Sequence, residues 1–204
     1  MVEWRQFSLR GVSIINLLFA LVAIPIAVLS HEVTHYLAYH WFDFGNPRLS
    51  YASASYAEQE AFRRAFTTGG VSAAAQIADP TKVGIGTLSA IAFSLLAGAA
   101  ALVWSLRSLS VFAPLFAYAN FFRSPLIALM YATGRSEGAD EYRAEALLNV
   151  PATLPIALGC AGFLCSLYLI FAFTDRKEGI YLIVSSLIGL AIWMNLLGPL
   201  ILLT

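Results

Sequence analysis

Long apolar runs separated by short polar segments dominate the chain. Five runs are rich in Leu, Ile, Val, Ala and Phe and carry almost no charge: 11–42, 83–106, 108–134, 146–174 and 179–204. Only Glu32 and Arg123 bring a charged side chain into them. A helix rises about 1.5 Å per residue, so about 20 apolar residues cross a hydrocarbon core about 30 Å thick. The pattern therefore predicts five membrane-spanning helices.

The segment 58–79 has a different pattern. Its first half is charged, and its second half is small and apolar and begins at Gly69 and Gly70. Backbone that enters lipid without regular helix must be shielded by protein or must line a water-filled cavity. We expect an interfacial helix followed by a membrane-dipping half, with a sixth full span as the alternative.

The composition excludes a water-soluble globule. Hydrophobic residues make up 59% of the 204 residues and charged residues 12%, about half the charged fraction of an ordinary soluble domain. The mean hydropathy is +0.75. Twelve basic residues balance twelve acidic ones, so no excess charge points to nucleic acid. The sequence predicts one domain, 1–204, that is an all-α, multi-pass integral membrane protein. We expect a polytopic bundle of about five to six helices, with a short re-entrant or extended segment after the first.

The three histidines of the chain are all close together, at the end of the first apolar run. His31, Glu32 and His35 form the pattern HExxH on a predicted continuous helix. Residues four apart lie on one helix face about one turn apart, where two imidazoles can hold the same Zn²⁺ ion. Glu32 is placed to reach a metal-bound water rather than to be a ligand. His40 lies nearly opposite on the helix wheel and is interpreted as an interfacial residue.

The lipid environment favours a functional interpretation of this pattern. Ionisable side chains cost several kcal/mol in hydrocarbon, and an intramembrane His or Glu therefore marks a functional site by default. The alternative is a solvated helix face, or histidines that sit at the membrane boundary. We retain the metal hypothesis.

A zinc site needs at least one more protein ligand and an open position for water. The acids Glu137, Asp140 and Glu141 follow the run 108–134. If 58–79 does not span the membrane, the first and third long helices run parallel, and these acids meet the histidines at one face. Alternatively, 137–145 is only a polar loop that opens an amphipathic helix, with its acids at the N-terminus.

The residues resemble the site-2 protease group, which are intramembrane zinc metalloproteases of the M50 type. The match is densest over 31–53, HEVTHYLAYHWFDFGNPRLSYAS, which is similar to the HExxH helix of the family and the extended segment after it. The phrase EGADEYRAEALLNVP resembles the Gly-x-Asp segment of minimal relatives. The resemblance implies a minimal form without PDZ or CBS domains.

The resemblance also implies roles for individual residues. His31, His35 and Asp140 would be the zinc ligands, and Glu32 would be the catalytic base. Asn120 would correspond to the asparagine that assists the oxyanion. The chain departs from the family pattern because Asp140 lies in Ala-Asp-Glu rather than Leu-Asp-Gly, and because twenty positions separate Asn120 from Asp140.

These residues predict an intramembrane zinc endopeptidase that cuts in or near a transmembrane segment of another membrane protein, with the lipid bilayer as its surroundings. Residues 43–57 alternate apolar and small polar side chains and could pair with an unwound substrate strand. Arg123 is interpreted as a structural ion-pair partner of an acid in the cluster. Two other functions remain open: an inactive membrane scaffold or regulator, and a small proton or metal transporter that uses the same His, Glu and Asp residues.

Overall fold

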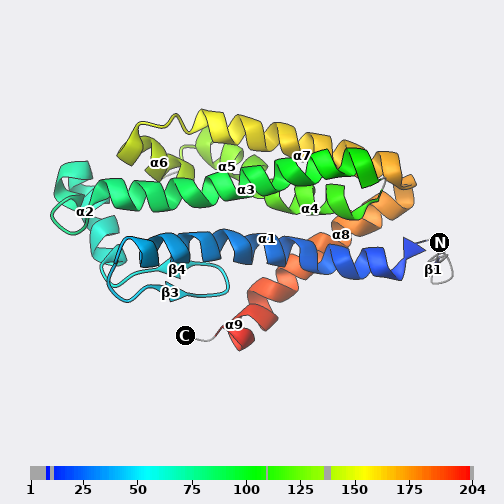
Figure 1. Cartoon of the computed structure of the whole chain (residues 1–204), viewed down its shortest axis with the longest axis horizontal. Coiled ribbons are helices and arrows are strands. Elements are labelled where there is room, and N and C mark those ends of the chain that lie inside the picture. Colours follow the sequence, from blue (N-terminus) through cyan, green and yellow to red (C-terminus); the bar gives the residue numbers. More distant parts are fainter. Residues whose placement is uncertain (1–7, 10–11, 109, 136–138, 203–204) are drawn as a thin grey trace.

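A computed structural model describes residues 8–9, 12–108, 110–135 and 139–202, which are mostly helical (Figure 1). Two short strands, β1 (Ser8–Leu9) and β2 (Val12–Ser13), pair antiparallel before the first helix. The helices are α1 (Ile14–Trp41), α2 (Gln59–Ala74), α3 (Pro80–Ser108), α4 (Phe112–Phe121), α5 (Arg123–Ala132), α6 (Asp140–Leu148), α7 (Thr153–Phe173) and α8 (Arg176–Ile192). A π-helical turn, η3 (Trp193–Leu197), and α9 (Gly198–Ile201) continue α8. The expectation of a mostly helical chain is confirmed.

Four helices are long and apolar enough to cross a membrane, judged by length and composition: Ile14–Trp41, Pro80–Ser108, Thr153–Phe173 and Arg176–Ile201. The remaining predicted span, 108–134, instead forms the two ten-residue helices α4 and α5. Pro125 explains the division, because it has no N–H to donate to the carbonyl of Phe121, one turn earlier. The run of helix is therefore interrupted at Phe122, between Asn120 and Arg123, although Phe122 itself keeps helical dihedral angles.

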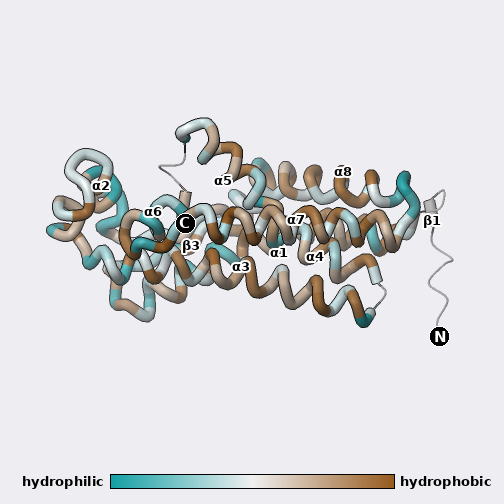
Figure 2. Tube along the Cα trace, turned by 90° about the horizontal axis from the view of Figure 1, so that it is seen from above, coloured by the Kyte–Doolittle hydropathy of each residue, from teal (hydrophilic) through white to brown (hydrophobic). Residues whose placement is uncertain are grey.

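The segment 58–79 contains the largely exposed helix α2, which is not among the four apolar helices. Gly70 interrupts it with a φ of 69°, a left-handed conformation that glycine adopts without steric cost. Figure 2 shows hydrophilic residues gathered around α2 and hydrophobic residues along the long helices.

An extended segment follows α1, as the sequence predicted. Strands β3 (Arg48–Leu49) and β4 (Ala54–Ser55) form an antiparallel hairpin in which Leu49 is opposite Ala54. The indole N–H of Trp193, in η3, donates a 2.9 Å hydrogen bond to the carbonyl of Tyr51 near the hairpin bend. The hairpin is thus held between the end of α1 and the C-terminal helices.

Close helix packing depends on small residues at the crossings. A Cβ added to Gly189 of α8 would lie 1.7 Å from the carbonyl oxygen of Leu21 in α1. The ring of Phe121 in α4 fills the space beside Gly98 of α3 and Gly162 of α7. Small residues of this kind let helix backbones approach closely in membrane bundles.

Helices α1 and α4 run in the same direction, as the sequence predicted. Near their beginnings, the rings of Phe19 and Phe112 meet edge to face with centroids 4.9 Å apart. Further along both segments, His31 of α1 touches Arg123 at the start of α5. This parallel arrangement brings α6, which follows α5, to the histidine end of α1 (Figure 1).

Candidate metal centre

The two histidines of HExxH are buried on one face of α1. His31 and His35 are each 5% exposed. The Nδ1 atom of His31 lies 3.0 Å from the hydroxyl of Ser94, and Nδ1 of His35 donates to the carbonyl of Gly86 at 3.2 Å. Metal-binding histidines are usually oriented through the second ring nitrogen in this way. Helix α3 therefore orients both rings and directs their Nε2 atoms to the same place.

Asp140 joins the two histidines from a distant part of the sequence. Its Oδ2 atom lies 3.2 Å from Nε2 of His31 and 3.4 Å from Nε2 of His35. Asp140 is in the first turn of α6, where the helix dipole favours a carboxylate. The structure therefore brings the acid to the histidines across 109 positions of sequence.

These three residues, the His-His-Asp group, could hold a metal ion. Their candidate ligand atoms all lie within 4.8 Å of one another. Tetrahedral zinc with bonds of about 2.0–2.1 Å places its ligand atoms about 3.3–3.4 Å apart. The observed separations of 3.2 and 3.4 Å fit that arrangement, and two imidazoles with one carboxylate are a donor set that zinc accepts.

The charge state of Asp140 suits a ligand. Burial by itself raises the pKa of Asp140, but hydrogen bonding with His31 and His35 and the positive charge of Arg123 outweigh it. The pKa is held well below its usual range, so Asp140 is a carboxylate at neutral pH.

Of the other two candidate acids, only Glu141 lies in the described part of the chain, and it is not part of the group. Glu137 lies outside the described residues. Glu141 is 4% exposed, and its Oε2 accepts a 3.2 Å hydrogen bond from Nη2 of Arg123. Of the three candidates, Asp140 is thus the acid that the described structure places with the histidines.

Glu32 is held beside the group by the hairpin. Its Oε2 atom accepts a 2.8 Å hydrogen bond from the backbone N–H of Ala54 in β4. Glu32 lines a cavity of about 210 Å³ together with residues of α1, α3, α4, α5 and α6: Ile24, Ala27, Val28, His31, Ser94, Ala119, Asn120, Phe122, Arg123 and Asp140. We call this space the site cavity.

Asn120 also lines the site cavity, despite its distance from Asp140 in the sequence. It is 4% exposed, and its Nδ2 donates a 2.9 Å hydrogen bond to the carbonyl of Phe116. Its Oδ1 is buried, and within the described part of the chain it has no hydrogen-bond partner. A buried amide oxygen without a partner is uncommon in proteins and marks a position of interest.

Arg123 lies against the group, which agrees with the ion pair expected from the sequence. Its Nη2 donates to Oδ2 of Asp140 at 3.0 Å as well as to Glu141. Its Nη1 lies 3.3 Å from Nδ1 of His31 and also contacts Nε2 of that ring. Sequence reasoning did not identify Glu141 as a partner of Arg123, or Ser94 and Gly86 as partners of the histidines.

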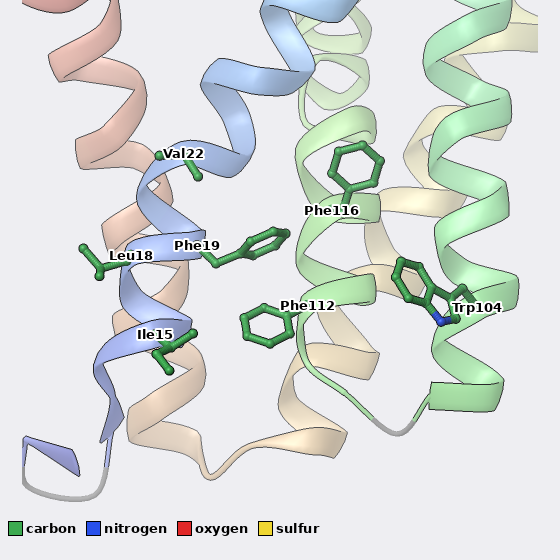
Figure 3. Close-up of a pocket in the computed structure, with 7 residues that line it drawn as sticks. All are labelled: Ile15, Leu18, Phe19, Val22, Trp104, Phe112 and Phe116. Carbon is green, nitrogen blue, oxygen red and sulfur yellow. The ribbon is translucent and has the colours of Figure 1, made fainter. Parts of the chain in front are cut away.

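A second cavity, of about 750 Å³, has an apolar lining. Figure 3 shows this groove between α1, α3 and α4, lined by apolar side chains: Ile15, Leu18, Phe19, Val22, Trp104, Phe112 and Phe116. The rings of Phe19, Phe112 and Phe116 gather in its centre. Its lining supplies no acid, base or metal ligand.

Fold and site together define a helical chain of membrane type with a buried group suited to a metal ion. In comparisons with known proteins, no family model, no curated protein and no solved structure matches this chain. Its function must therefore be argued from the site itself.

Proposed function

We propose that this protein is an intramembrane zinc endopeptidase of the site-2 protease type, which hydrolyses a peptide bond in or near a transmembrane segment of another protein. The observation that carries the proposal is that His31 and Asp140 of the His-His-Asp group line one cavity together with Glu32 and Asn120, while His35 completes the group beside them.

A multi-pass position in the membrane is supported by the lengths of the helices and by their surfaces. Large apolar side chains face outward from all four long helices, as at Leu18 (59% exposed), Leu96 (70%), Leu164 (65%) and Val184 (45%). Contiguous apolar surface of this kind is rare in soluble monomers. Helices α4 and α5 together form the fifth passage of the proposed bundle, which gives α1 and α4–α5 the same orientation in the bilayer.

Zinc fits the donor set of His31, His35 and Asp140. When bound, zinc polarises a peptide carbonyl and lowers the pKa of its water toward about 7, which supplies hydroxide at neutral pH. The protein contributes the orientation of both imidazoles through Ser94 and Gly86, and a carboxylate that stays ionised.

Glu32 is the proton acceptor in the proposed reaction. The N–H of Ala54 fixes one carboxylate oxygen, so the side chain stays beside the site cavity rather than sampling other rotamers. A carboxylate in that place can take a proton from the attacking water and pass it to the leaving amine.

Asn120 is the proposed hydrogen-bond donor to the carbonyl oxygen. One N–H of its amide is used by the carbonyl of Phe116, and the second N–H remains for a group in the cavity. A hydrogen-bond donor beside the position where negative charge develops stabilises that charge in the transition state, and this is the role proposed for Asn120.

Strand β4 is the proposed docking edge for an unwound substrate. The N–H of Ala54 points to Glu32 and away from β3, so this edge of the hairpin faces the site. An extended peptide that adds a strand here would lie beside Glu32 with its carbonyls exposed to attack.

The test is cleavage of a single-span membrane protein, reconstituted with the purified chain and zinc in detergent or liposomes. Wild type should cut the substrate, and Glu32→Gln should retain zinc but lose cleavage. Glu60→Gln, which removes an exposed carboxylate on α2, is the matched control and should cut normally. An inactive scaffold would show no cleavage in any variant. A transporter would lose zinc or proton flux in Glu32→Gln without any peptide bond being cut.

A further inference from the structure

Arg123 is the one arginine among the residues that line the site cavity, which include no lysine. It is the first residue of α5 and lies three positions after Asn120, which lines the same cavity. The Arg123 side chain is half-buried, with 29% of it exposed, and a cation at this depth in a membrane-type bundle is expected to have a counter-charge. Its partners therefore indicate what it does.

The guanidinium contacts the atoms that a metal ion would use. Nη1 lies against Nε2 of His31, and Nη2 donates to Oδ2 of Asp140 at 3.0 Å. These are the same two atoms that make the His31–Asp140 contact in the His-His-Asp group. A metal ion needs the lone pair of Nε2 and the charge of Oδ2, and it repels a neighbouring cation. Arg123 and a metal ion cannot both hold these atoms.

Glu141 is a second carboxylate partner for Arg123. Its carboxylate is buried, accepts a 3.2 Å hydrogen bond from Nη2 and is not part of the His-His-Asp group. Metal binding would occupy Asp140 but would leave Glu141 available. The buried Glu141 carboxylate also needs a cation whether or not metal is present, because an unpaired buried charge is strongly destabilising.

We propose that Arg123 is a positioning residue that takes the place of the metal ion in the metal-free protein and is displaced onto Glu141 when the ion binds. In the metal-free protein it holds His31 and Asp140 together and neutralises the acids of the centre. The bound ion then replaces Arg123 as their cation. The inference rests on the metal centre of the proposed function, but it does not require peptide hydrolysis.

Displacement has a measurable consequence for metal affinity. Zinc must break the hydrogen bonds of Arg123 to Asp140 and His31 before it can bind. Loss of one hydrogen bond to a charged group changes an equilibrium constant, here that of zinc binding, by about tenfold to hundredfold. The native residue therefore weakens zinc binding, although it stabilises the metal-free fold.

The experiment measures zinc affinity of the full chain in detergent by competition with a chromophoric chelator. Arg123→Gln should bind zinc about tenfold or more tightly than wild type. The matched control is Arg143→Gln, which removes the same charge from a side chain 3.7 Å from the other oxygen of Asp140. Its affinity should stay within about threefold of wild type, since Oδ1 is not the atom that both histidines share. Equal gains in both variants would mean that general charge repulsion acts, and weaker binding by Arg123→Gln would mean that Arg123 supports the loaded site. Either result overturns the proposal.

Thermal unfolding provides a second measurement that does not depend on the affinity assay. Metal-free Arg123→Gln should unfold at a lower temperature than metal-free wild type, and zinc should raise its midpoint by more than it raises the midpoint of wild type. If Arg123→Gln folds only with zinc, the chelator can instead extract zinc from the loaded variant and from loaded wild type. The variant should then retain its zinc more strongly than wild type. Arg123→Lys keeps the charge but not the planar guanidinium, so its zinc retention should lie between those of wild type and Arg123→Gln. Indistinguishable zinc retention in all three proteins would contradict the proposal.

The two proposals fail in different ways. A zinc-loaded wild type that cuts no membrane substrate would end the peptidase proposal and leave the zinc comparison valid. Cleavage by wild type with equal zinc affinity in Arg123→Gln would end the displacement proposal alone. The absence of zinc binding from every variant would end both.

Discussion

The Nε2 atom of His31 lies 3.2 Å from Oδ2 of Asp140, although the two residues are 109 positions apart in the sequence. His35 meets the same oxygen at 3.4 Å. The group is assembled by two parallel segments, α1 and α4–α5, with α6 folded back onto the histidine face. The site is therefore a product of the tertiary fold, and its properties can be tested by changes on either segment.

Replacement of Asn120 by Ala should lower kcat by about 10²–10³-fold with no loss of zinc, because it removes one oriented donor from the position where negative charge develops. Asn195→Ala is the matched control. Asn195 makes the same hydrogen bond to the carbonyl one turn earlier, at 2.8 Å, but is exposed near the end of the chain. Steady-state cleavage and zinc content of both variants check this prediction. An unchanged kcat in Asn120→Ala would remove Asn120 from the reaction.

A proline at position 54 should reduce cleavage by about tenfold or more. Proline has no N–H, so Glu32 loses the donor that fixes its carboxylate. The zinc content should be unchanged, since Ala54 touches none of the three ligands. Ala52→Pro changes the bend of the same hairpin and is the control. Equal activity of the two variants would argue against any role for the hairpin in orienting Glu32.

Gly189→Ala should destabilise the helix bundle, by about 1–3 kcal/mol if the helices can separate slightly. The added methyl group would lie 1.7 Å from the carbonyl oxygen of Leu21, which is backbone and cannot rotate away. Thermal unfolding in detergent measures the effect. Ile188→Ala, at a neighbouring and 48% exposed position of α8, should leave the midpoint nearly unchanged. A Gly189→Ala protein as stable as wild type would mean that α1 and α8 do not cross so closely.

Much of the architecture was predictable from local pattern. Apolar runs long enough to span a bilayer predicted α1, α3, α7 and α8, and HExxH placed His31 and His35 on one face of a helix. The division of 108–134 into α4 and α5 was not predicted, although Pro125 could have indicated it, because proline removes one hydrogen bond of a continuous helix. The run 146–174 likewise forms the end of α6, a turn and then α7. Asn149 ends α6 in a left-handed conformation, and Pro151 follows it in the turn.

For the site, only the relation between residues of the same helix was predictable from the sequence. Periodicity relates residues within one helix, so it predicted the relation of His31 to His35 but left Glu137, Asp140 and Glu141 as alternatives. Only the fold shows which acid meets the rings. Ser94 and the carbonyl of Gly86 carried no signal at all, because a serine or a glycine in an apolar helix usually serves close packing. Their role depends on the way α3 lies beside α1.

The most direct test of the central claim is the zinc content and coordination of the purified wild-type chain, determined by elemental analysis and X-ray absorption at the zinc edge. We expect one zinc per chain, with two imidazoles and one carboxylate oxygen as protein ligands at about 2.0–2.2 Å. His35→Ala should lose stoichiometric zinc. His40→Ala should keep it, because that exposed histidine lies outside the His-His-Asp group. A wild-type protein that binds no zinc, or that loses zinc equally in both variants, would contradict the claim.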